Sequence, residues 1–207
     1  TGILGLFAFI LVPFGFRMPS APVVLVGIFT GILFITALYL FFKALKQGEV
    51  SRIGISLGGL VPFFTLLFVY IGTRELPAQR EMLALLLLGS GSLVIAFDHY
   101  EKLLHNLKIL TLLFASSFLF GLYFTLAKFL FAGMYPFVTV FIAIKIGGAL
   151  CALCFLFSPT VRKTLFEHKT TPPKKAGGIF VIKNAAGGVG ALLLHLAVSS
   201  ARFTEVA

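Results

Sequence analysis

The sequence predicts an all-α membrane protein, a bundle of helices that each cross a lipid bilayer. Two observations lead to this fold class. Of the 207 residues, 59% are hydrophobic and only 12% are charged, whereas soluble domains carry about 25% charged residues. The apolar residues also form several uncharged runs of about 20, the length that a helix needs to cross the hydrocarbon core. This composition excludes a water-soluble globule.

Six complete spans and one partial span are expected. The first run, 1–16, is apolar but too short to cross a bilayer, so we expect a truncated span there. The complete spans are predicted in order at 21–42, 53–73, 82–97, 109–131, 136–158 and 176–201. Charged or proline-containing turns separate them. Because the chain begins with Thr1 and not with Met, we expect a fragment that is truncated at both ends.

Small residues and one proline mark positions inside these spans. Gly27 and Gly31 are four residues apart, and so are Gly54 and Gly58. Such pairs let two helix backbones approach closely in lipid, so we expect a helix contact at each. Pro62 removes a backbone donor in the middle of its span. It predicts either a helix break that exposes carbonyl groups to a cavity or a kink that packing tolerates.

The net charge of +10 comes from lysine and arginine residues that lie mostly between the spans. There they meet phospholipid headgroups. No nucleic-acid motif occurs, so we predict membrane lipids and not nucleic acid as partners. Ten of these residues lie in the loops 43–52, 98–108 and 159–175, and three lie in the alternate loops. The excess of positive charge places the first set of loops in the cytoplasm.

Polar side chains inside the spans are the candidate functional residues, since placing a lysine at the bilayer centre costs ~2.5–3.5 kcal/mol. Lys145 lies near the middle of its span. It predicts either binding of an anionic substrate group or a structural contact with carbonyl groups at helix ends. Asn184 could form a hydrogen bond across helices. His195 is either a proton carrier or a packed residue.

The chain also carries a weak internal match. A shift of 156 residues places Gly187 on Gly31 and Glu205 on Glu49. Internal repeats of this kind are common in secondary transporters. The same shift places His195 on Tyr39, so we expect Tyr39 to line an equivalent wall of a cavity.

The stretch 37–79 resembles the EamA repeat of the drug/metabolite transporter superfamily. The resemblance lies in a small residue, a polar turn, Val61-Pro62 in the next helix, then Glu75-Leu76 and Gln79. It implies ten spans in two inverted five-helix repeats, of which residues 1–98 hold helices 2–5 and residues 109–207 hold helices 6–8. Lys145 lies where the family's second helix usually carries arginine. The family's sixth helix often carries tryptophan, which this chain lacks.

The resemblance implies a transporter in the plasma membrane that moves a small metabolite by alternating access, with no catalytic residue, metal or cofactor. The expected cavity residues are Lys145, Asn184, Tyr39, His195 and Pro62. A homodimer is expected if the chain is an unpaired half. The family's usual topology, with both termini inside, opposes the orientation that the charges predict, and the sequence leaves this conflict open.

Two functions from other classes stay open. One is a multi-span enzyme that acts on lipid-linked substrates, with the basic loop 159–175 and a polar group of Asp98, His99, Glu101 and His105. The other is a scaffold that transports nothing. Hydrolase and ATPase motifs do not occur, so the favoured prediction is that the chain is not an enzyme. The CxxC pair, Cys151 and Cys154, is expected to pack as two small apolar residues.

Overall fold

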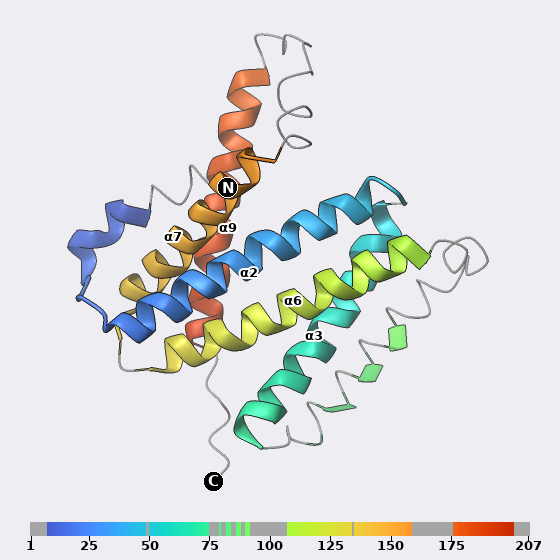
Figure 1. Cartoon of the computed structure of the whole chain (residues 1–207), viewed down its shortest axis with the longest axis horizontal. Helices are drawn as coiled ribbons and strands as arrows, with labels where there is room; N and C mark the ends of the chain where they lie inside the picture. Colours follow the sequence, from blue (N-terminus) through green and yellow to red (C-terminus); the bar gives the residue numbers. More distant parts are fainter. Residues whose placement is uncertain are drawn as a thin grey trace. The chain divides into compact units, whose positions relative to one another are not determined.

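The computed structural model of this chain is built from helices. It describes residues 8–48, 50–74, 79, 82–83, 86–87, 90–91, 107–133, 135–158 and 176–200. The helices are η1 (Ala8–Phe14), α2 (Ala21–Leu45), α3 (Val50–Thr73), α6 (Leu107–Ala132), α7 (Phe137–Leu156) and α9 (Ala176–Ser200), drawn in Figure 1. The described ranges contain no strand, which confirms the predicted all-α class.

Four of these helices are long and apolar enough to cross a membrane. They are α2, the Ile53–Thr73 part of α3, α6 and α7. At 1.5 Å per residue, 20 residues cover ~30 Å, the thickness of the hydrocarbon core. Large apolar side chains also stay exposed on them, such as Leu25 at 67% and Phe63 at 60%. Because lipid and not water suits such a surface, these helices indicate a multi-pass membrane protein.

The number of spans is lower in the described residues than the six predicted. The predicted run 82–97 lies mostly outside these residues. Helix α9 matches the predicted 176–201, but its described apolar part, Ala186–Ala197, is shorter than a span. The described part of the run 1–16 forms η1, a 3-10 helix with Pro13 inside it and not an α-helix.

Pro62 does not break its helix. Helix α3 continues through Pro62 from Val50 to Thr73. A proline removes one backbone hydrogen bond, and neighbouring helices can hold both halves of the helix in line. Of the two alternatives predicted at Pro62, the structure therefore contradicts the helix break and leaves the tolerated proline.

The chain divides into two compact units. Unit 1 contains residues 1–32 and 127–207, and unit 2 contains residues 33–126. Helices α2 and α6 each contribute one part to each unit. Each unit therefore takes chain from both sides of the predicted repeat boundary near residues 98–109. The inverted repeat itself stays a prediction.

In unit 2, α2 and α6 lie side by side and run in opposite directions (Figure 1). Ser116 Oγ donates a hydrogen bond to the carbonyl of Ala37, with 2.9 Å between the oxygens. The rings of Phe34 and Phe120 contact each other with 5.9 Å between their centroids. From Ser116 to Phe120 the chain of α6 advances, while the partner on α2 moves back from Ala37 to Phe34, as an antiparallel arrangement requires.

Helices α3 and α6 run in the same direction. Near the start of both helices, Ile53 and Leu113 share a buried cluster. Further along, the rings of Phe64 and Phe118 lie 5.6 Å apart between centroids. A Cβ atom added at Gly121 would lie only 2.6 Å from Cβ of Phe64, so the missing side chain is what permits this contact. Both helices consequently begin at the same end of unit 2.

In unit 1, α2 crosses α7 at small residues. A Cβ atom added at Gly27 would lie 2.6 Å from Cβ of Ala143, and one added at Gly31 would collide with the backbone of α7. A Cβ atom at Gly147 would in turn collide with the backbone at Ile28. The predicted close contact at Gly27 and Gly31 is confirmed.

The second glycine pair behaves differently. A Cβ atom added at Gly54 or Gly58 would meet nothing within 4 Å in the described part of the chain. The contact of α3 with α6 uses Phe64 and the glycine on α6, Gly121, instead. The predicted close contact at Gly54 and Gly58 does not occur among the described residues.

Side-chain hydrogen bonds attach the segment before α2 to the start of α7. The backbone nitrogen of Arg17 donates to Thr139 Oγ1, and Thr139 Oγ1 donates to the carbonyl of Arg17, each over 3.0 Å. The hydroxyl of Tyr135 donates to Ser20 Oγ over 2.9 Å. This attachment holds one end of α7 in place within unit 1.

Candidate functional site

The first half of α7 is covered on all sides. Pro136 precedes the helix, and its carbonyl accepts the N–H groups of Thr139 and Val140. The six consecutive residues from Thr139 to Ile144 are all buried. Because a helix turns once every 3.6 residues, six consecutive buried residues occupy its whole circumference. Unit 1 supplies the cover from η1, α2 and α9.

Lys145 directly follows this buried stretch. It is the ninth residue of α7, about 12 Å from the start of the helix, and so lies near the middle of a bilayer-spanning helix. Its Nζ atom lies 4.9 Å from the centroid of the Phe141 ring. Phe141 is one turn earlier on the same face, where a residue four positions away is a neighbour. The distance suits a cation–π contact between the ammonium group and the ring.

His195 on α9 contacts the same phenylalanine. Its side chain is only 3% exposed. The imidazole lies edge-on to Phe141, with 5.1 Å between centroids, and edge-on to Phe131, with 6.0 Å. Nδ1 of His195 lies 2.6 Å from the carbonyl oxygen of Ala191. A proton on Nδ1 fits this contact, since a carbonyl oxygen accepts a hydrogen bond.

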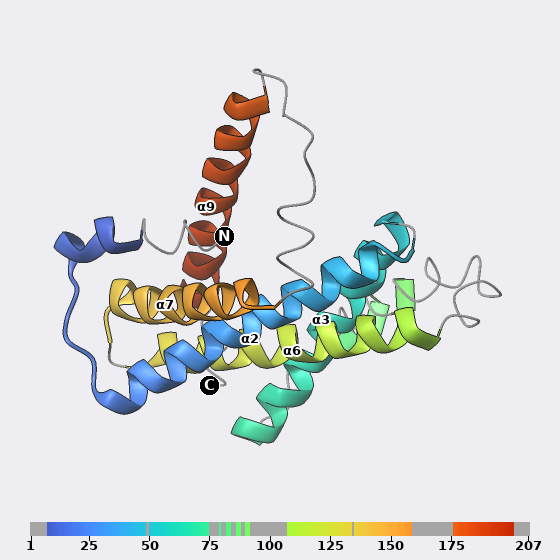
Figure 2. The ribbon, with the colours of Figure 1, turned by 45° about the horizontal axis from the view of Figure 1, so that its top comes forward.

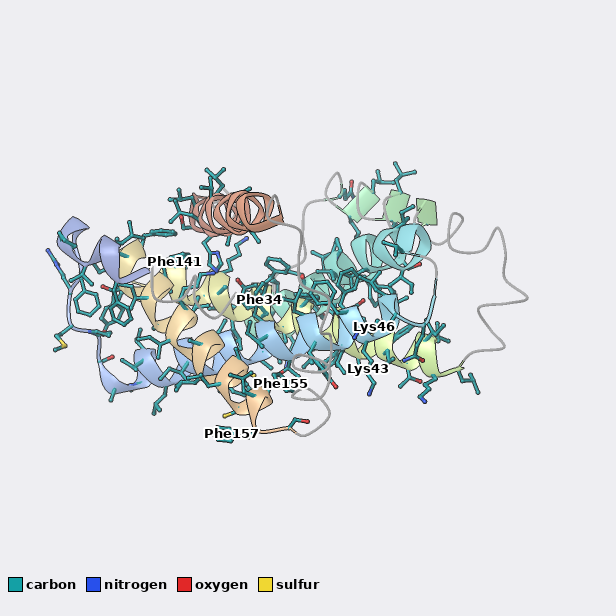
Figure 3. The ribbon with its side chains drawn as sticks, turned by 90° about the horizontal axis from the view of Figure 1, so that it is seen from above. Phe34, Lys43, Lys46, Phe141, Phe155 and Phe157 are labelled. Atoms are coloured by element: carbon teal, nitrogen blue, oxygen red, sulfur yellow. The ribbon has the colours of Figure 1, made fainter. Side chains whose placement is uncertain are left out.

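Phe141 therefore joins two of the predicted site residues. Figure 3 shows Phe141 on α7 below α9. Its ring also stacks on Phe137, which stacks on Phe131, with centroid distances of 5.6 and 5.2 Å. We call Phe131, Phe137, Phe141, Lys145 and His195 the Lys145 cluster. It combines one cation, one imidazole and three aromatic rings inside a membrane protein.

Two of the other predicted site residues lie outside this cluster, and the side chain of the third is not described. Tyr39 on α2 and Pro62 on α3 belong to unit 2, where Tyr39 is 37% exposed and Pro62 is half-buried. Asn184 lies on α9, the helix that carries His195, but its side chain lies outside the described part of the structure. Only Lys145 and His195 are brought together.

Sequence reasoning missed the aromatic part of the cluster. Phe137 and Phe141 precede Lys145 at intervals of four residues, so all three share one helix face. That spacing could have predicted from the sequence that the two rings lie beside Lys145. The contribution of Phe131 was not readable, because it lies before the turn that separates α6 from α7.

A second polar feature lies on α6 in unit 2. Ser116 and Ser117 are both fully buried. The hydroxyl of Ser116 reaches the carbonyl of Ala37, whereas Ser117 Oγ has no hydrogen-bond partner within the described residues. A buried hydroxyl without a partner lowers stability by ~1–3 kcal/mol, so the Ser117 hydroxyl is expected to destabilise this part of α6.

The remaining polar candidates do not form a site in the described residues. These residues hold no group of three or more His, Cys, Asp or Glu side chains that could bind a metal ion. Cys151 is buried and Cys154 is exposed, and neither forms a disulfide with a described residue. The acidic and histidine residues at 98–105 and the basic loop 159–175 lie outside the described part of the chain.

Comparisons with known proteins found no matching family model, curated protein or solved structure. The resemblance of residues 37–79 to the EamA repeat therefore stays a prediction from the sequence.

Proposed function

We propose that this chain is part of a plasma-membrane transporter that moves a small metabolite with an anionic group by alternating access. The observation that carries the proposal is the position of Lys145. It lies in the middle of a membrane-spanning helix, directly after a fully buried stretch, and its ammonium group contacts a ring that His195 also contacts. An ionisable residue at this depth is a functional candidate because its insertion is costly.

The chemistry of the cluster suits an anionic substrate. In a site with little water, an ammonium group attracts a carboxylate or phosphate much more strongly than at a surface. Phe141 holds the ammonium group from one side, and the stacked rings offer an apolar wall for the rest of the substrate. The resemblance to the EamA repeat supports transport over the other membrane functions.

Transport is tested with the purified full chain in liposomes. Uptake of labelled amino acids, organic acids and sugar phosphates is measured for the wild type and for Lys145→Met. We expect uptake of an anionic solute by the wild type and a fall to background in the variant, because methionine keeps the length of the side chain but removes the charge. Normal uptake by Lys145→Met would remove Lys145 from the site.

The matched control is Lys128→Met. Lys128 is a half-buried lysine on α6, four residues before the end of its helix, where a long side chain can reach the interface. This variant should keep its uptake, and both variants should insert into the membrane in wild-type amounts. If the wild type transports none of these solutes, the scaffold function or the lipid-substrate enzyme replaces transport. Turnover of a lipid-linked substrate would separate these two.

A further inference from the structure

A basic rim lies at the end of unit 2 where α2 ends and α3 and α6 begin. A buried cluster of Ala44, Ile53, Ile109 and Leu113 fixes this end. Lys43 directly precedes Ala44, and Lys108 directly precedes Ile109. The packing of these two apolar residues therefore holds the backbones of both lysines at the same end. Figure 3 shows Lys43 and Lys46 there.

The turn after α2 adds the third lysine. The backbone nitrogen of Lys46 donates to the carbonyl of Phe42 over 3.1 Å, and that of Gln47 donates to Ala44 over 2.9 Å. A Cβ atom added at Gly48 would lie 2.8 Å from Cδ1 of Ile53, so the turn packs tightly on the buried cluster. Lys46 is thereby fixed beside Lys43.

Two of the three lysines in this rim stand next to an exposed apolar residue. Phe42 is 53% exposed next to Lys43, and Leu107 is 71% exposed next to Lys108. Side chains of these two kinds meet at the border of a bilayer, where apolar groups enter the acyl chains and ammonium groups reach the headgroups. The described residues of this rim include no acidic side chain, and Glu49 in the same turn lies outside them.

We propose that Lys43, Lys46 and Lys108 bind the phosphate of an anionic phospholipid in the cytoplasmic leaflet. Basic residues at the cytoplasmic end of membrane helices attract anionic headgroups. The three lysines lie at the same end of unit 2, so their charges act on the same region of headgroups. The exposed Phe42 and Leu107 favour a lipid over a soluble anion, since only a lipid brings acyl chains to cover them. This binding does not depend on the transport function.

The proposal is tested on the purified full chain in detergent, by native mass spectrometry. Phosphatidylglycerol and phosphatidylcholine with the same acyl chains are titrated separately, and inorganic phosphate is added as a competitor. We expect retention of phosphatidylglycerol alone, with affinity that falls about fivefold for each Lys→Gln substitution at positions 43, 46 and 108. Inorganic phosphate at the same concentration as the lipid should not displace the lipid.

Two controls separate this site from general attraction. Arg74→Gln removes an exposed positive charge at the opposite end of α3 and should leave the affinity unchanged. The triple Lys→Arg variant keeps the charges and should retain the lipid. Full lipid affinity in the triple Lys→Gln variant would overturn the proposal, and so would effective competition by inorganic phosphate. If that variant does not fold, the lipid affinity of the wild type is measured at increasing ionic strength instead. An affinity that does not change with ionic strength would overturn the proposal equally.

Discussion

At the residue scale, the free-energy cost of placing Lys145 in the membrane explains why this side chain is a functional candidate. Its insertion near the bilayer centre costs ~2.5–3.5 kcal/mol. A cation–π contact such as that with Phe141 returns only ~0.5–2 kcal/mol. The ring therefore offsets part of the cost. An anionic ligand beside the ammonium group would add further stabilisation, which makes Lys145 a candidate for binding one.

Two neighbouring serines offer a test of hydrogen bonding in this protein. Ser116→Ala should lower the free energy of unfolding by ~0.6 kcal/mol, the average for a hydrogen bond between membrane helices. Ser117→Ala should leave this free energy unchanged or raise it, because its hydroxyl has no partner in the described residues. Both variants are measured by reversible unfolding in mixed micelles. A larger loss of stability from Ser117→Ala than from Ser116→Ala would contradict this account.

At the element scale, the same glycine spacing has two different outcomes. Gly31 on α2 lies against the backbone of α7, whereas a Cβ atom at Gly58 on α3 would meet no described residue within 4 Å. The spacing shows that one face of the helix carries small residues. It does not show whether a partner helix lies on that face, since the partner comes from a distant part of the chain.

The two glycines form a matched pair for substitution by alanine. Gly31→Ala places a Cβ atom in the α7 backbone and must separate the helices, so we expect a loss of ~1–3 kcal/mol in stability. Gly58→Ala adds a methyl group in open space and should be neutral or stabilising by up to ~1 kcal/mol. Thermal unfolding in detergent measures both. Equal melting temperatures for the two variants would show that α2 and α7 are not in close contact.

At the scale of the whole molecule, the directions of the helices in unit 2 decide which residues lie at the same end. Figure 2 shows α2, α3 and α6 from a second side. Because α3 and α6 both begin where α2 ends, Lys43, Lys46 and Lys108 lie at one end of unit 2. Arg74 follows α3, so it lies at the opposite end of unit 2. The span predicted at 82–97 lies mostly outside the described residues and stays a prediction.

The orientation is testable with single cysteines in a variant that lacks Cys151 and Cys154. Gln47→Cys and Met18→Cys lie just beyond opposite ends of α2, and both positions are exposed. We expect a membrane-impermeant maleimide to label Met18→Cys in intact cells, and Gln47→Cys only after the membrane is opened, because the basic end should be cytoplasmic. The reverse pattern would support the topology of the EamA family, and equal labelling of both would indicate a dual orientation.

The sequence by itself determined the helical membrane class, the bounds of four spans to within a few residues, and Lys145 and His195 as site candidates. These properties depend on local composition and on the cost of polar groups in lipid, which each segment carries alone. Only the tertiary structure decided that α3 continues through Pro62, that Gly31 and not Gly58 meets a partner, and that Phe141 joins Lys145 to His195. These depend on contacts between segments far apart in the chain. Local pattern does not encode such contacts, because several partners would satisfy the same apolar or small-residue face.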